Sequence, residues 1–179
     1  YKTPKKISNT HKAFDPIDLS LVSDDYFPRT NFGPAMEMAS YRDQFTACQW
    51  DVTKRHVDFF RLGVRCMVAL NSERSLVAAI IPPGVAHVHA VESLSFRKEK
   101  NLLRAQALMA SLVADFFVKA SGTQSMFSSN TARFPFPELC DTALSRALRL
   151  NCLSSYYEDL WNRQASSLSV LSWSSSDPR

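Results

Sequence analysis

A strict alternation of apolar residues constrains the fold of this chain more than any other feature of the sequence. In RLGVRCMVAL, residues 61–70, the apolar positions are Leu62, Val64, Cys66, Val68 and Leu70. Successive side chains of a strand point to opposite faces, so this spacing predicts a half-buried strand. The turn-forming residues NSER follow, and then the apolar run SLVAAII, which ends at Pro82-Pro83. We therefore predict a β-hairpin of strands 61–70 and 75–82, ended by prolines that cannot donate to a ladder.

The second half of the chain changes from a period of two to a helical period. Between residues 99 and 120, apolar side chains recur every three or four positions: Leu102, Leu103, Leu108, Leu112, Val113, Phe116 and Phe117. This predicts one long amphipathic helix of about six turns, closed by Ser121-Gly122. A second helical pattern covers residues 138–163, and we expect it to break near Asn151. The expected fold class is α+β, with a twisted, mainly antiparallel sheet packed against the long helix and further C-terminal helices.

Length and composition fit one domain with flanking segments. The 179 residues suffice for a single core. Residues 1–35 are punctuated by proline and are expected to form an extended arm on a domain of residues 36–163, while the Ser-rich residues 164–179 are expected to be a tail. No apolar run is long enough to cross a bilayer, and YKTPKK leads into polar residues rather than into the apolar core of a signal peptide. We expect a cytoplasmic protein without a membrane partner.

The sequence lacks the motifs of several common classes of enzyme and ligand-binding protein. The sequence contains no phosphate-binding glycine loop, no G-x-S-x-G and no H-E-x-x-H. His87-x-His89 on a strand would place two imidazoles on one face, about 7 Å apart, but no third ligand is evident, so no metal site is expected. The four cysteines are widely spaced without C-x-x-C, which favours reduced thiols.

The remaining candidate functional residues are basic and aromatic. The net charge is +4, and cations gather in the predicted hairpin and on both sides of it: Lys54, Arg55, Arg61, Arg65, Arg74, Arg97 and Lys98. Each of these could belong to an ordinary solvated face. Strand alternation, however, places Arg61 and Arg65 together opposite the apolar row, which is compatible with a ridge that contacts phosphates. Arg65 could alternatively be structural and pair with Asp51 or Asp58.

Several segments resemble a known family. YFPRTNF, LGVRCMVALNSERSLVAAIIPPGVAHVHAVESL, LLRAQALMASLVADFFVKASG, ARFPFPEL and LRLNCLSSYYEDLW are similar to the C-terminal target-recognition region of adenine-specific DNA methyltransferases. That region is the TaqI-like specificity domain of type IIG restriction–modification and related phage-defence enzymes. The similarity spans residues 26–161, and the arginine strand and the helix–loop–FPFP layout are its most specific parts.

The resemblance implies a DNA-reading domain without catalytic activity. The Asn/Asp-Pro-Pro-Tyr/Phe motif and the glycine motif for S-adenosylmethionine are absent from the sequence. The implied partners are double-stranded DNA and a methyltransferase domain of the same parent protein, which would hold S-adenosylmethionine and flip the adenine; this chain itself would need no cofactor. Base-reading residues would lie on the two loops that flank the predicted long helix, and the candidates are His87, His89, Gln124, Ser128 and Asn130.

Two other functions remain open at this point. The Leu/Phe stripe of the predicted long helix could pack on a partner helix, in a protein-interaction or structural module. A small enzyme could instead use His87 or His89 with a nearby cysteine or aspartate.

Overall fold

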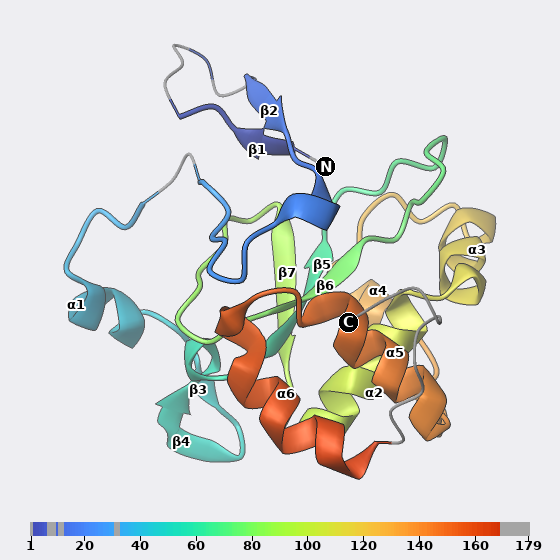
Figure 1. The fold of residues 1–179 in the computed structure, drawn as a ribbon. Coiled ribbons are helices and arrows are strands. Elements are labelled where there is room, and N and C mark those ends of the chain that lie inside the picture. The colour runs from blue at the N-terminus through green and yellow to red at the C-terminus, as the bar shows by residue number, and fades with distance from the viewer. Residues whose placement is uncertain (1, 7–9, 11–12, 31–32, 169–179) are drawn as a thin grey trace.

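A three-stranded antiparallel sheet in the order β6-β5-β7 organises the fold (Figure 1). The computed structural model describes residues 2–6, 10, 13–30 and 33–168. Strand β5 (Arg61–Arg65) pairs with β6 (Ala78–Ile81) on one side and with β7 (Val91–Ser95) on the other. The predicted hairpin is therefore confirmed, although its strands are shorter than expected. The mixed pattern VESLS of β7 gave no strand signal in the sequence.

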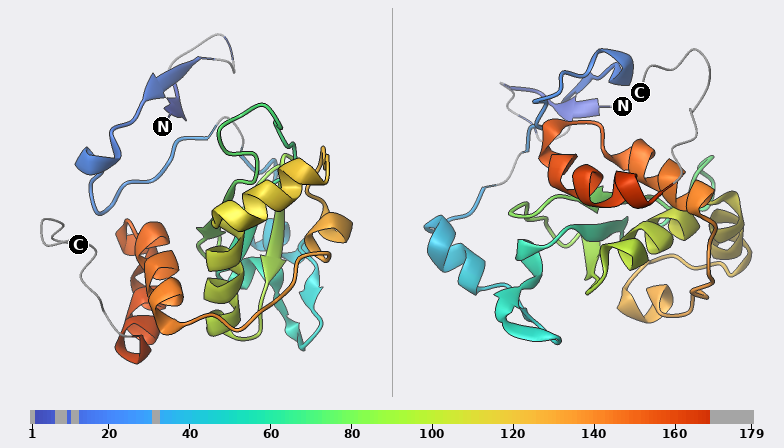
Figure 2. Two further views of the ribbon diagram at one scale, coloured as in Figure 1. Left: turned by 90° about the vertical axis from the view of Figure 1, so that its right-hand side faces the viewer. Right: turned by 60° about the horizontal axis from the view of Figure 1, so that its bottom comes forward.

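The fold is a mixture of helices and small antiparallel sheets, and its core lies on one face of the central sheet. Leu62 and Val64 of β5 have no exposed surface and pack with Leu102 and Leu103 of helix α2 (Glu99–Met109). The other side of α2 contacts α5 (Asp141–Asn151) and α6 (Glu158–Gln164). Figure 2 shows the resulting order of layers, with α2 between the sheet and the C-terminal helices.

The predicted single helix over residues 99–120 is wrong. The segment forms α2 and a second helix, α3 (Leu112–Ala120), with a bend of 61° between them. Ser111 caps the N-terminus of α3, and its Oγ accepts the N–H of Ala114 at 3.1 Å. At the break, the guanidinium of Arg74 donates to the carbonyl of Ala110 at 2.8 Å. The apolar period continues through the break, so periodicity alone could not reveal it.

A buried carboxylate fixes the loop between β5 and β6 to helix α3. Asp115 is 4% exposed, and its Oδ1 accepts the N–H groups of Ser75 at 2.8 Å and Leu76 at 2.7 Å. Burial acts most strongly on the pKa of Asp115 and would raise it. The N–H groups of Leu76 and Ser75, together with Lys119, outweigh that effect and hold the pKa below its usual value. Because residues 75 and 76 bond to Asp115, β6 begins only at Ala78.

Side chains of the C-terminal helices cover the outer edge of β6. As expected, the helical pattern of residues 138–163 breaks at Asn151, where α5 ends. The Asn151 side chain accepts the N–H of Ile80 at 2.8 Å, and the Tyr157 hydroxyl donates to the Ile80 carbonyl at 2.8 Å. Burial raises the pKa of Tyr157 to about 12, so this hydroxyl stays protonated as a donor.

The remaining elements flank this core. They are β1 (Lys2–Pro4), β2 (Phe14–Pro16), α1 (Met38–Asp43), β3 (Ala47–Cys48), β4 (Asp51–Arg55) and α4 (Ser128–Thr131), with 3-10 turns at Leu19–Leu21, His56–Asp58, Ser155–Tyr157 and Ala165–Ser167. The N-terminal segment folds back on itself, because β1 and β2 form an antiparallel pair. It meets the C-terminal region where Phe27 contacts Tyr156, with ring centroids 5.3 Å apart.

The structure bears on the expected C-terminal tail and on the expected reduced thiols. Leu168 is buried against the core, whereas residues 169–179 of the expected tail lie outside the described residues. All four cysteines are free. Among the described residues, no single helix has both the length and the apolar character needed to cross a membrane; α2 and α3 meet that test only when joined across their bend.

Candidate nucleic-acid interface

Two loops that are far apart in the sequence meet at the Arg65 end of the sheet. The imidazole of His89 stacks on the ring of Phe127, with centroids 5.5 Å apart and an interplanar angle of 22°. Both loops are bound to the residues that continue β5. The N–H of Cys66 donates to Ala90 O at 2.9 Å, and Cys66 O accepts the N–H of Met126 at 2.7 Å. Backbone hydrogen bonds therefore hold these loops side by side.

We call this region the His89 surface and define it by residues of both loops and of the β5 continuation: Arg65, Met67, His89, Gln124, Phe127 and Ser128. All of them are exposed, and Met67 reaches 74%. Three of the five candidate base-reading residues thus fall on one surface. Asn130 lies beside it, but its side-chain amide donates to Ser125 O at 2.7 Å and supports the loop from within. The sequence gave no indication that Met67 and Phe127 would be exposed beside His89.

His87 is separated from His89. Residues 85–90 do not form a strand, so the two imidazoles do not share a face. His87 Nε2 lies 2.8 Å from the Ser93 hydroxyl, which also accepts a hydrogen bond from Arg61 at 3.3 Å. This places His87 against β7 and away from the His89 surface. In the described part of the chain, no three His, Cys, Asp or Glu side chains converge in a way that could hold a metal ion.

The structure places Arg61 inside the protein. Its side chain is 1% exposed and donates to Val85 O and to the Ser93 hydroxyl. Burial lowers the pKa of Arg61. The loop after β6 covers this face of the sheet, which alternation within β5 could not show. Arg61 is therefore no part of a phosphate-contacting surface.

Arg74 and Arg65 differ in their surroundings. Arg74 binds the Ala110 carbonyl, and its Nε lies 3.7 Å from Asp115, so it supports the junction of α2 and α3. Arg65 is exposed, and among the described residues its side chain makes a single, long polar contact, 3.4 Å to Ser75 O. The expected alternative pairing with Asp51 or Asp58 does not occur. Arg42 binds the Asp58 carboxylate at 2.6 Å, and the Asp51 carboxylate accepts the Thr53 hydroxyl at 2.6 Å.

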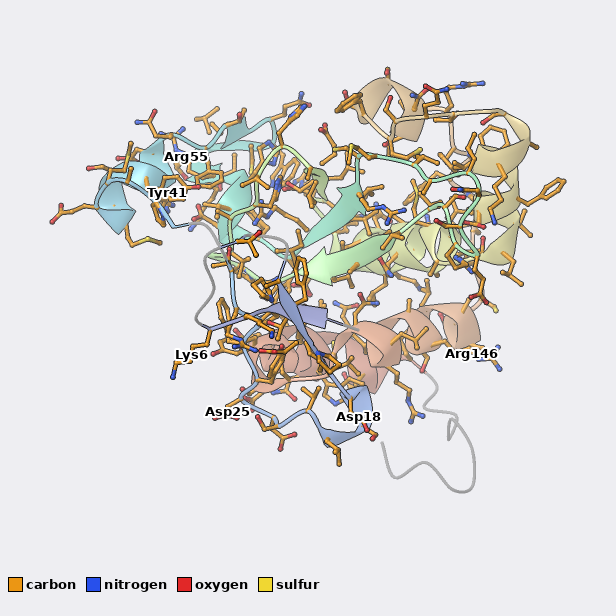
Figure 3. All side chains as sticks on the ribbon, turned by 90° about the horizontal axis from the view of Figure 1, so that it is seen from above. Lys6, Asp18, Asp25, Tyr41, Arg55 and Arg146 are labelled. Atoms are coloured by element: carbon orange, nitrogen blue, oxygen red, sulfur yellow. The ribbon has the colours of Figure 1, made fainter. Side chains whose placement is uncertain are left out.

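Four further candidate cations lie away from the His89 surface. Arg97 and Lys98 are exposed between β7 and α2, at the end of the sheet where Arg61 pairs with Ser95. Lys54 and Arg55 belong to β4, and Figure 3 shows Arg55 at the edge of the molecule near Tyr41. Within the described residues, none of the four forms a salt bridge. Their charges are therefore available to an anionic partner.

A cysteine–histidine pair occurs elsewhere in the structure, but its surroundings oppose catalysis. Cys48 Sγ lies 3.9 Å from His56 Nδ1. Cys48 is 1% exposed, and burial raises the pKa of its thiol, with smaller effects from Asp58 and Asp51. Burial, together with the charge of Arg61, lowers the pKa of His56. Both shifts favour the neutral thiol and imidazole, whereas a catalytic cysteine acts as a thiolate.

Comparison of the chain with models of protein families, with curated proteins and with solved structures gives no significant match.

Proposed function

We propose that this chain is the DNA sequence-recognition domain of an N6-adenine DNA methyltransferase of the restriction–modification type. It would select the target site for a methylase domain that lies outside the chain. The observation that carries the proposal is the junction of the two expected reading loops, in which His89 stacks on Phe127 beside the exposed Gln124 and Ser128. Exposed polar side chains on adjacent loops are suited to contact base edges.

The unpaired cations supply the phosphate contacts that such a reader needs. Arg97 and Lys98 leave the sheet at one end of β7, and the His89 loop enters at the other. The five residues of β7 span roughly 14 Å at ~3.4 Å per residue. The major groove is about 12 Å wide, so a reading loop in the groove leaves these cations near the flanking backbone.

Duplex binding by this chain is expected to weaken as salt rises, since every phosphate neutralised releases condensed counterions. The triple change Lys54→Ala, Arg97→Ala and Lys98→Ala should lower the magnitude of the salt slope by roughly three units, about one for each lost contact. Fluorescence anisotropy at several salt concentrations measures this. Arg146→Ala is the control, because Arg146 is exposed on α5, on the opposite side of the molecule from Arg55 (Figure 3). Equal slopes for the triple variant and the control would contradict the proposed phosphate contacts.

Base reading is tested in the intact methylase. His89→Ala and Gln124→Ala should relax or shift the methylated motif. The Gln124 amide can make a bidentate base contact, which contributes about 1–3 kcal/mol of discrimination at one base pair. Sequencing for N6-methyladenine reports the motif directly. Lys98→Ala is the matched change, which should reduce methylation without altering the motif. A motif unchanged by both loop substitutions would show that the His89 surface does not read bases.

One observation favours a second candidate, a protein-interaction module. The outer face of α3 exposes Leu112, Val113 and Phe116 at 73%, 77% and 71%. Contiguous exposed apolar side chains of this size are typical of interaction surfaces. This candidate gains support if duplex binding is absent and binding to another protein is lost when these three residues become serine.

A further inference from the structure

A cleft opens at the Arg61 end of the sheet, away from the His89 surface. It has a volume of about 370 Å³ and lies between the residues that precede β5, the junction of β7 with α2, and helix α6. Its apolar lining consists of Phe59, Phe60, Phe96 and Leu102, and its polar lining of Arg97, Glu99, Arg163 and Gln164. Ligand sites usually range from about 300 to 1,000 Å³, so this cleft suits a small ligand.

The three phenyl rings of the cleft are held in place by other aromatic rings. Phe59 packs edge-on against Trp50, Phe60 stacks with Tyr157, and Phe96 stacks with Phe136, with centroids 5.8, 6.2 and 6.4 Å apart. Rings that are already ordered lose little entropy when a ligand binds. Such a wall favours a flat aromatic group, which contacts phenyl rings in stacked or edge-on geometry.

The polar groups of the cleft favour an anion. The negative charge of Glu99 is neutralised by another cleft residue, because Arg163 binds the carboxylate at 2.7 Å. The Gln164 amide also donates to it at 2.9 Å. Arg97, in contrast, has no carboxylate partner among the described residues, and the exposed Lys98 follows it. An aromatic wall beside unpaired cations is complementary to a ligand that carries both a flat ring and a negative charge.

We propose that this cleft binds a single nucleotide, with the base against Phe59 and Phe96 and the phosphate at Arg97 and Lys98. The choice of a nucleotide among aromatic anions rests on the proposed DNA-binding function. The nucleotide can be free in solution or can be an unstacked residue of a DNA strand, because both present the same base and phosphate. In either case stacking on aromatic side chains tolerates any base, so the cleft is expected to bind without sequence preference.

Titration calorimetry with 5′-dAMP tests the cleft without a duplex. Binding is expected for the unaltered chain and should weaken about 5- to 100-fold in Phe59→Leu, which removes one stacking surface while remaining apolar. Arg97→Glu should also abolish measurable binding through its charge. Arg146→Glu is the matched charge reversal outside the cleft and should bind as the unaltered chain does. Equal affinity of the unaltered chain and Phe59→Leu for 5′-dAMP, or an equal affinity for inorganic phosphate alone, would overturn the proposal.

A second arm distinguishes the two sources of the nucleotide. A duplex with one unpaired, bulged nucleotide is compared with the fully paired duplex. Tighter binding of the bulged duplex, lost in Phe59→Leu, supports capture of a base from DNA, and 5′-dAMP binding without that preference supports a free nucleotide. If paired duplex binds with the expected salt slope but 5′-dAMP does not bind, the cleft proposal alone fails. If 5′-dAMP binds but no duplex does, the DNA-recognition function fails and the nucleotide site stands.

Discussion

Replacing Asp115 with alanine is expected to lower the free energy of unfolding by about 3–5 kcal/mol, the range for removing one partner from a buried charged network. One carboxylate oxygen accepts the N–H groups of both Ser75 and Leu76, and the other lies 3.3 Å from the ammonium of Lys119. The alanine variant leaves two buried N–H groups without an acceptor, which is the costly part of the change. Urea unfolding followed by circular dichroism measures the loss.

Asp115→Asn separates the charge of the carboxylate from its role as an acceptor. The amide oxygen can still accept the N–H groups of Ser75 and Leu76, so this variant should lose less than the alanine variant. The folded pKa of Asp115 lies below its usual value, so the charge stabilises the fold above the unfolded pKa of about 3.9. That contribution disappears as the pH falls through the folded pKa. The stability difference between the unaltered chain and Asp115→Asn should therefore be full near neutral pH and shrink below about pH 4; a constant difference would contradict this assignment.

The second large effect is expected at the outer edge of β6. Asn151→Ala and Tyr157→Phe remove the acceptor and the donor that satisfy the backbone of Ile80. Each orphaned group costs about 1–3 kcal/mol, so the double variant should lose about 2–6 kcal/mol if the two costs add. Thermal or urea unfolding of the single and double variants measures both the sum and any coupling.

Tyr156→Phe is the matched control for the edge of β6. Tyr156 is 46% exposed and neighbours Tyr157 in sequence, and its ring contact with Phe27 does not need the hydroxyl. Its loss of stability should stay within about 0.5 kcal/mol, as for most surface changes. A Tyr157→Phe variant that is no less stable than Tyr156→Phe would show that the Ile80 carbonyl does not depend on the tyrosine hydroxyl.

The spacing of apolar residues within single segments was enough to predict one core strand and two core helices. The alternation of Leu62 and Val64 identified β5 and its core face, because a strand packed on one side selects apolar residues at every second position. The helical spacing around Leu102 and Leu144 likewise identified two core helices. The break at Ser111 escaped prediction, because a capping serine within a continuous apolar period looks like an ordinary helix residue. The contacts of Arg74 with Ala110 and of Ser75 with Asp115 form only when the loop before β6 is brought to this helix.

The candidate site could be predicted only in part, for a related reason. The sequence indicated that the loops around His89 and Gln124 carry polar side chains, and the structure brings them together. It did not indicate that His87 would turn to Ser93 or that Arg61 would be covered by the loop at Val85. Both outcomes depend on the path that residues 82–90 take across the sheet. No local sequence pattern predicts the path of such a loop.

The way in which the two loops of the His89 surface are attached has a consequence for which of its residues can be substituted. Ala90, Gln124 and Met126 are fixed to the continuation of β5 through their main-chain N–H and C=O groups. Any residue other than proline offers the same donor and acceptor. Side chains of the His89 surface can thus be substituted while the two loops keep their positions. The chemistry of this surface can therefore be altered by single substitutions without rebuilding its scaffold, which makes it suited to directed engineering.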